Sequence, residues 1–246
     1  MGRITEAIKH LIILNVILFA ATSFLPDINL GSYLALYFPQ NKHFGFWQFV
    51  SHMFMHGGFT HILFNMYALW AFGSPLEQMW GRNKFLFFYF SAGIGAGLIY
   101  TAVNYFQFNN IYEELISAGI QNSEIQNLLK TGSYNTGILE HISEKRLTDL
   151  YQIYNTPAVG ASGAIYGVLV AFGMSFPNAK LALIFFPVPI AAKYFIPVLI
   201  GLDLFSGVTG FSLFGGGIAH FAHVGGAIIG FVMMKYWQKN QFQRWN

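Results

Sequence analysis

The stretch GASGAIYGVLVAFGMSF, residues 160–176, contains no charged side chain and is apolar along nearly its whole length. Its polar side chains are few, and Ser162 stands among small residues at its beginning. A segment of this kind predicts a helix from about residue 161 to residue 176 that crosses a membrane. Comparable apolar stretches recur along the chain, so this segment indicates the fold class.

The composition supports a membrane protein. Of the 246 residues, 54% are hydrophobic and only 9% are charged, whereas a soluble domain carries about 25% charged residues. High hydrophobicity also excludes a disordered chain. The absence of cysteine excludes disulfides, thiolate metal sites and a cysteine nucleophile. A net charge of +3 from scattered basic residues gives no indication of nucleic-acid binding.

We predict an all-α, polytopic membrane bundle of six transmembrane helices, forming a single membrane domain over residues 1–246. The fifth span is interrupted by Pro187, Pro189 and Lys193, so we interpret residues 181–191 as an interfacial lead-in. The expected spans are about 11–25, 59–77, 85–106, 161–176, 192–205 and 218–236.

The basic residues predict the orientation. With the N-terminus in the cytoplasm, eight of the 13 Lys and Arg residues lie in inside segments and four lie outside, with Lys193 undecided. Positive charge is enriched on the cytoplasmic side of membrane proteins. Both termini are therefore expected to face the cytoplasm.

Two segments outside the spans have features of their own. Residues 107–157 form a polar insertion on the outer side, between the third and fourth spans, and their apolar spacing predicts two or three short amphipathic helices. Residues 207–217 are rich in glycine and directly precede the sixth span. We expect this second segment to be a mobile cap over the site described next.

Polar side chains of three spans gather at one depth. His61 and Asn65 lie four residues apart and share one face of the second span. Ser162 opens the fourth span with Tyr166 one turn below, and His223 lies near the start of the sixth. All three spans run inwards, so these groups lie within roughly 10 Å of the outer boundary. Such a gathering inside a membrane predicts a functional site.

Glycines allow the fourth and sixth spans to approach closely. Gly160, Gly163 and Gly167 belong to the fourth span, and Gly226 and Gly230 belong to the sixth. Facing surfaces without side chains let two backbones come together. A Ser–His hydrogen bond of about 2.6–3.2 Å needs such an approach.

Ser162 and His223 together indicate nucleophilic catalysis. Ser162 is the candidate nucleophile, and His223 is the general base that later returns the proton to the leaving amine. The sequence places no carboxylate to orient His223, so we expect a dyad rather than a triad, with Tyr166 stacked on the imidazole. His61, Asn65 and the Ser162 backbone N–H are the donors for an oxyanion.

Other interpretations of these residues stay open. A serine in a membrane helix often bonds back to a carbonyl one turn earlier, and histidine or asparagine often joins two helices. Histidines 52, 56, 61, 220 and 223 could form a metal or haem site, although no carboxylate accompanies them in the sequence. That alternative gives Ser162 and its glycines no role, so we expect no metal and no cofactor.

The motifs resemble those of the rhomboid intramembrane serine proteases. The matching strings are His52-x3-His56-x4-His61-x3-Asn65, Gly160-Ala161-Ser162-Gly163 and Ala222-His223-x2-Gly226-x3-Gly230. The resemblance implies hydrolysis of peptide bonds within the membrane by a Ser162–His223 dyad without a cofactor. It makes His61, Asn65 and the Ser162 amide the oxyanion hole, and Tyr166 the residue stacked on the base. Glu77 matches a structural acid at the cytoplasmic end of the second span.

The resemblance also implies the partners. The expected substrates are single-span membrane proteins, cut near the outer membrane face, and the other partner is the lipid bilayer. The oligomeric state does not follow from the sequence. A catalytically silent relative that binds membrane clients is the alternative function, but such relatives usually lose the serine or the histidine. We expect a bacterial inner membrane, because no long N-terminal extension precedes the first span.

Overall fold

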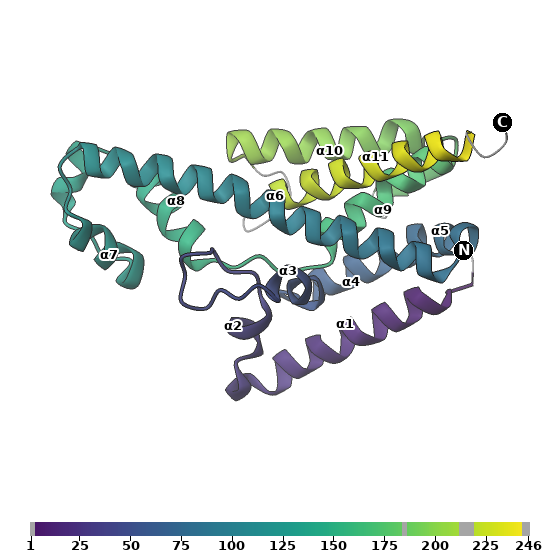
Figure 1. Ribbon diagram of the computed structural model, residues 1–246, viewed down its shortest axis with the longest axis horizontal. Helices are drawn as coiled ribbons and strands as arrows, with labels where there is room; N and C mark the ends of the chain where they lie inside the picture. Colours follow the sequence, from purple (N-terminus) through teal and green to yellow (C-terminus); the bar gives the residue numbers. More distant parts are fainter. Residues whose placement is uncertain (1–2, 184–185, 212–218, 243–246) are drawn as a thin grey trace.

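The computed structural model describes residues 3–183, 186–211 and 219–242, and helices make up most of them (Figure 1). Three described helices are long and apolar enough to cross a membrane: α1 (Glu6–Phe24), α6 (Arg82–Ser117) and α10 (Ala192–Thr209). Two further helices, α9 (Ser162–Ser175) and α11 (His220–Phe242), lie beside them. The apolar all-α character is confirmed, while the number of spans and the side of the termini stay predictions.

The second expected span consists of three consecutive helical segments. They are α4 (Phe59–Ala68), the π-helix η3 (Leu69–Gly73) and α5 (Ser74–Trp80). Near its end, the buried Glu77 carboxylate accepts hydrogen bonds from the backbone N–H groups of Ala7 at 2.9 Å and Ile8 at 3.2 Å. The Thr5 hydroxyl donates to the same carboxylate. Glu77 thus caps the free N–H groups at the start of α1 and joins α1 to α5.

Small residues form the contacts at the centre of the molecule, where α9 packs against α6 and α11. A Cβ atom added at Gly230 would lie 2.6 Å from the Gly167 Cα, and one added at Gly167 would lie 2.7 Å from the Ala92 Cβ. Gly226 faces the carbonyl oxygen of Gly163 with no room for a side chain. The three helix axes are therefore close because these positions carry no larger side chain.

The insertion begins inside a helix rather than after one. Helix α6 continues for 36 residues to Ser117 without a break at the expected end of the third span. The remainder contains the helices expected there: α7 (Asn122–Thr131), the 3₁₀ turn η4 (Thr136–Glu140) and α8 (Glu144–Asn155). Phe108, Ile111 and Leu115 continue one buried face of α6, so the first part of the insertion belongs to this helix and the expected short helices follow it.

The segment between α1 and α4 positions the beginning of α9. Leu36 and Ala158 form an isolated antiparallel bridge, with N–H to O distances of 2.9 and 2.8 Å. Two residues later, the Gly160 N–H donates to the His52 carbonyl at 2.9 Å. The short extended segment before Ser162 is therefore fixed by backbone hydrogen bonds at both Ala158 and Gly160. The short helices of the connecting segment are η1 (Pro26–Ile28), α2 (Leu30–Leu34), α3 (Gln48–Ser51) and η2 (His52–Phe54).

The lead-in to the fifth span forms a hairpin that the sequence pattern did not predict. Strand β1 (Lys180–Leu183) pairs antiparallel with β2 (Phe186–Ala191). Helix α10 then begins at Ala192 as expected, and ends four residues beyond the predicted end, where Gly210 adopts a φ of 73°. Of the predicted cap over residues 207–217, residues 212–217 lie outside the described part of the chain.

The two ends of the helix layer differ (Figure 1). The beginning of α1 and the end of α11 lie at one end of the molecule, and α7 and α8 lie at the opposite end. The length of the helix layer therefore separates the insertion from the beginning of α1 and the end of α11.

Candidate active site

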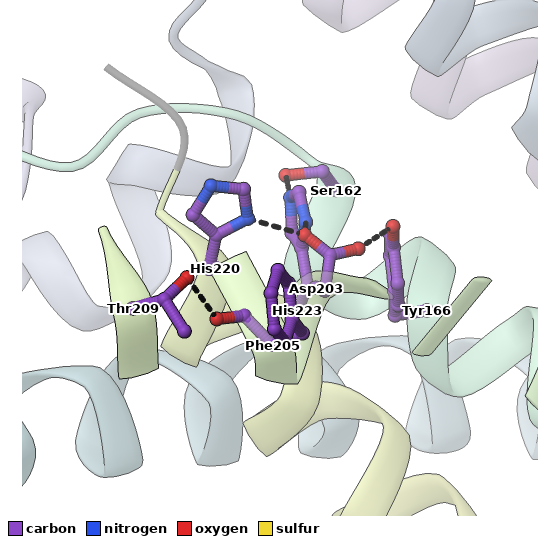
Figure 2. Close-up of polar contacts among 7 residues, drawn as sticks. All are labelled: Ser162, Tyr166, Asp203, Phe205, Thr209, His220 and His223. Atoms are coloured by element: carbon purple, nitrogen blue, oxygen red, sulfur yellow. Dashed lines mark hydrogen bonds and ion pairs between the residues drawn. The ribbon is translucent and has the colours of Figure 1, made fainter. Parts of the chain in front are cut away.

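The site begins where α9 and α11 meet. Ser162 is the first residue of α9, and His223 lies in the first turn of α11. The Ser162 Oγ is 2.8 Å from the His223 Nε2, a hydrogen-bond distance (Figure 2). The glycine contacts that follow on the same two helices, Gly163 with Gly226 and Gly167 with Gly230, make this approach sterically feasible.

Tyr166 lies one turn below Ser162 and covers one face of the histidine. Its ring is stacked on the His223 imidazole, with 4.2 Å between the ring centroids and 11° between the planes. Stacking of this kind restricts rotation of the imidazole about its side-chain bonds. The Tyr166 hydroxyl donates a hydrogen bond to the Asp203 carboxylate.

A carboxylate does face the histidine, contrary to the sequence-based expectation. Asp203 of α10 places its Oδ1 3.1 Å from the His223 Nδ1 and 2.6 Å from the His220 Nδ1 (Figure 2). The aspartate is buried. The prediction that no carboxylate orients His223 is therefore wrong. The available signal was Asp203 itself, because a charged residue within a span marks a candidate functional site.

The same cluster offers the ligand types that a metal would use. Asp203, His220 and His223 each present one ligand atom, and these atoms lie within 4.8 Å of one another. The expectation that no carboxylate accompanies the histidines is wrong for this reason. Two histidines and a carboxylate suit zinc, but each of the three atoms already has a hydrogen-bond partner within the group. The arrangement is complete as a hydrogen-bonded network.

His61 and Ser162 lie around Gly160. The Gly160 φ of 121° favours glycine, and an added Cβ would lie 2.8 Å from the His61 Nε2 and 3.6 Å from the Ser162 Oγ. The Gly57 N–H donates to the His61 Nδ1 at 3.4 Å. Since Nδ1 is then an acceptor, the neutral ring carries its proton on Nε2. A donor on α4 is thus directed at the region beside Ser162.

Three further polar residues belong to α4 or precede it. Asn65 is buried, and its Nδ2 donates to the His61 carbonyl at 2.8 Å, which leaves its second amide hydrogen available. His52 donates its Nδ1 hydrogen to the Gln48 carbonyl at 2.7 Å. The His56 ring nitrogens have no hydrogen-bond partner among the described residues. Burial lowers the pKa of His52 and of His56 to about 4, so both rings are neutral at pH 7.

Comparison with known protein families shows where the chain belongs, because the sequence model of the family described as the Rhomboid domain matches residues 43–239 of this chain. The chain belongs to the rhomboid family. Rhomboid relatives include presenilin-associated rhomboid-like protein A, mitochondrial, of Danio rerio, 29% identical over 194 residues, which cover 76% of this chain and 38% of the relative. Rhomboid protein 1, mitochondrial, of Saccharomyces cerevisiae is 28% identical over 177 residues, 72% of this chain and 38% of the relative.

A relative named as a protease is also similar. Rhomboid protease AarA of Providencia stuartii is 26% identical over 200 residues, which cover 75% of this chain and 53% of the relative. The matched part of this chain thus spans about two fifths of the mitochondrial rhomboid proteins and about half of the protease. The matched range contains the whole hydrogen-bonded group, from Ser162 to His223.

Proposed function

We propose that this rhomboid-family protein is an intramembrane serine endopeptidase that hydrolyses peptide bonds of single-span membrane proteins near the outer membrane face. The observation that carries the proposal is the 2.8 Å contact between the Ser162 Oγ and the His223 Nε2, made by residues 61 positions apart in the chain. A serine and a base at this distance are the arrangement that activates a hydroxyl as a nucleophile.

The proposed reaction uses these two side chains for all proton transfers. His223 Nε2 takes the hydroxyl proton as Ser162 Oγ attacks the carbonyl carbon of the scissile peptide bond. The imidazolium then gives this proton to the leaving amine, and the C–N bond breaks to leave an acyl-serine ester. Water, deprotonated by His223, attacks the ester and releases the second product, while the proton returns to Ser162.

The negative charge on the carbonyl oxygen needs donors while the tetrahedral intermediate exists. We assign this role to the His61 Nε2–H, the free amide hydrogen of Asn65 and the Ser162 backbone N–H. The support comes from the position of His61 next to Gly160 and from the Gly57 hydrogen bond that leaves its Nε2 as the donor. Removing one such donor typically costs about 10²–10³-fold in kcat.

The proposal includes six spans with both termini in the cytoplasm and the insertion outside. The distribution of Lys and Arg supports it, and so does the position of the beginning of α1 and the end of α11 opposite the insertion (Figure 1). The partners are transmembrane substrates and the bilayer. The bacterial inner membrane stays a prediction, since relatives include mitochondrial proteins as well as a protease of Providencia stuartii.

Cleavage of a single-span reporter in liposomes tests the proposal. Wild-type protein is compared with Ser162→Ala and His223→Ala, and with two matched controls, Ser175→Ala and the exposed His141→Ala. Ser175 lies at the other end of α9, about 20 Å from Ser162 at 1.5 Å per residue. We expect cleavage near the outer end of the reporter by the wild type and both controls, and none by the two site variants.

A serine-reactive fluorophosphonate probe distinguishes the enzyme from the silent client-binding alternative. Labelling of the wild type that requires both Ser162 and His223 supports an active site, even for a reporter that is not cut. Wild-type protein that neither cuts the reporter nor reacts with the probe would contradict the proposal in favour of client binding.

A further inference from the structure

Asp203 is a buried carboxylate of α10 that meets three hydrogen-bond donors from the two neighbouring helices (Figure 2). Its Oδ1 accepts from the Nδ1 atoms of His220 at 2.6 Å and of His223 at 3.1 Å, and its Oδ2 accepts from the Tyr166 hydroxyl. Only 7% of the residue is exposed. Burying an ionised carboxylate costs free energy unless it is hydrogen-bonded, and a charged residue within an expected span marks a candidate functional group.

The contact with Asp203 decides which nitrogen of His223 carries the proton. A carboxylate only accepts hydrogen bonds, so the neutral imidazole must present its hydrogen on Nδ1. The lone pair of Nε2 then points at the Ser162 hydroxyl, 2.8 Å away. In the opposite tautomer Nε2 would carry the hydrogen and could not accept the serine proton.

We infer that Asp203 is a positioning residue that completes a Ser162–His223–Asp203 triad. The inference rests on the proposed function and adds a third group to the expected dyad. Asp203 holds His223 in the Nδ1–H tautomer and stabilises the imidazolium that forms when His223 takes the proton from Ser162. The proton stays on the imidazole until it passes to the leaving amine, and the carboxylate remains ionised throughout.

His220 and Tyr166 fix the carboxylate itself. His220 donates to the same oxygen as His223, and Tyr166 donates to the other oxygen, so the carboxylate plane cannot turn without losing a hydrogen bond. The three hydrogen bonds also compensate an ionised group taken out of water. His220 and Tyr166 therefore act on His223 through Asp203, in addition to the direct stacking of Tyr166.

Kinetics of Asp203 variants in liposomes test the inference. Asp203→Asn keeps the shape of the side chain and removes its charge, Asp203→Glu keeps the charge, and Asp27→Asn is an exposed control. We expect Asp203→Asn to lower kcat by at least about 100-fold with a KM within about threefold of wild type. Asp203→Glu recovers part of the loss, and Asp27→Asn matches wild type. A kcat within about threefold of wild type for folded Asp203→Asn would overturn the inference.

Nuclear magnetic resonance of protein with ¹⁵N-labelled histidine gives a readout that a purely structural role would not change. We expect a strongly deshielded Nδ1 proton on His223 in the wild type, absent in Asp203→Asn. If Asp203→Asn does not fold, the wild-type spectrum decides alone, and a His223 ring protonated on Nε2 would overturn the inference.

The two measurements also separate this inference from the proposed function. A wild type that shows the deshielded Nδ1 proton but neither cuts the reporter nor reacts with the probe contradicts the function. Cleavage by folded Asp203→Asn at the wild-type rate contradicts the role of Asp203 and leaves the proposed function intact.

Discussion

The contact between α9 and α11 and the core of the insertion are packed in opposite ways. At the first, glycines of one helix face glycines of the other with no space for a Cβ atom. At the second, large apolar side chains from α6, α7, η4 and α8, from the turn between η4 and α8, and from the segment after α2 are buried against one another. These side chains are Phe38, Phe108, Ile111, Leu115, Ile125, Leu128, Leu129, Ile138, Ile142, Leu147 and Leu150.

The difference follows from the two environments that we propose: lipid around the contact between α9 and α11, and water around the insertion. Within lipid there is little hydrophobic drive between helices, so close van der Waals contact between small residues holds them together. In water the burial of apolar surface supplies the stability. Added volume should therefore damage the α9–α11 contact, whereas lost volume should damage the insertion.

The largest effect is expected for Gly226→Val. The new side chain collides with the carbonyl oxygen of Gly163, and overpacking of this kind costs about 1–3 kcal/mol or more. The collision pushes α9 and α11 apart. Because His223 lies one turn earlier on α11, it then moves away from Ser162, and we expect reporter cleavage to fall more than about 100-fold. Gly201→Val, whose site is open, is the matched control. Wild-type cleavage by Gly226→Val would contradict the close-contact account.

Leu150→Ala should produce the next largest effect, in the other region. Leu150 is fully buried in the insertion, and removal of such a side chain costs about 2–5 kcal/mol. Hydrogen exchange in α7 and α8 should accelerate, while exchange in α9 and probe labelling of Ser162 change less than about threefold. Leu139→Ala, at a 41% exposed position, serves as control. Equal acceleration in α9 would show that the two regions unfold as one unit.

Glu77→Gln tests a polar contact at the end of α5. The carboxylate accepts three hydrogen bonds at the start of α1, and hydrogen bonds to a charged group contribute about 1.5–3 kcal/mol. We expect a loss of stability in that range, measured as a lower unfolding temperature in detergent micelles. An unfolding temperature equal to that of the wild type would show that the cap adds nothing measurable.

The smallest effect is expected for Glu114→Gln. Glu114 of α6 pairs with Arg146 of α8, and both side chains are at least 40% exposed. Exposed ion pairs contribute about 0–1 kcal/mol, so the insertion should lose less stability than it does with Leu150→Ala. Denaturation followed by hydrogen exchange in α8 measures the difference. A loss as large as that of Leu150→Ala would mean that charge, and not apolar burial, holds the insertion.

Local pattern predicted much of the central packing. Apolar length located α9 and the start of α10, and the glycine spacing indicated which faces meet. The gathering of Ser162, Tyr166 and His223 followed from their equal depth, which depends only on helix rise and direction. These features depend on residues close together in the sequence, so the sequence alone predicts them.

Other features depend on partners that lie far away in the sequence. Asp203 faces His223 only because α10 has a particular rotation against α11, and hydropathy does not fix that rotation. Helix α6 passes residue 107 because its buried face extends into the insertion, where the expected membrane boundary does not end a helix. The hairpin of β1 and β2 arises in an apolar segment whose prolines indicated only an interruption.

The most direct test of the central claim is to locate a fluorophosphonate adduct by mass spectrometry. Wild-type protein and His223→Ala are treated in liposomes under identical conditions, and the labelled peptide is identified. The account predicts a single adduct on Ser162 in the wild type and its loss in His223→Ala, because the hydroxyl is reactive only beside the base. An adduct on another residue, or equal labelling of Ser162 without His223, would contradict it.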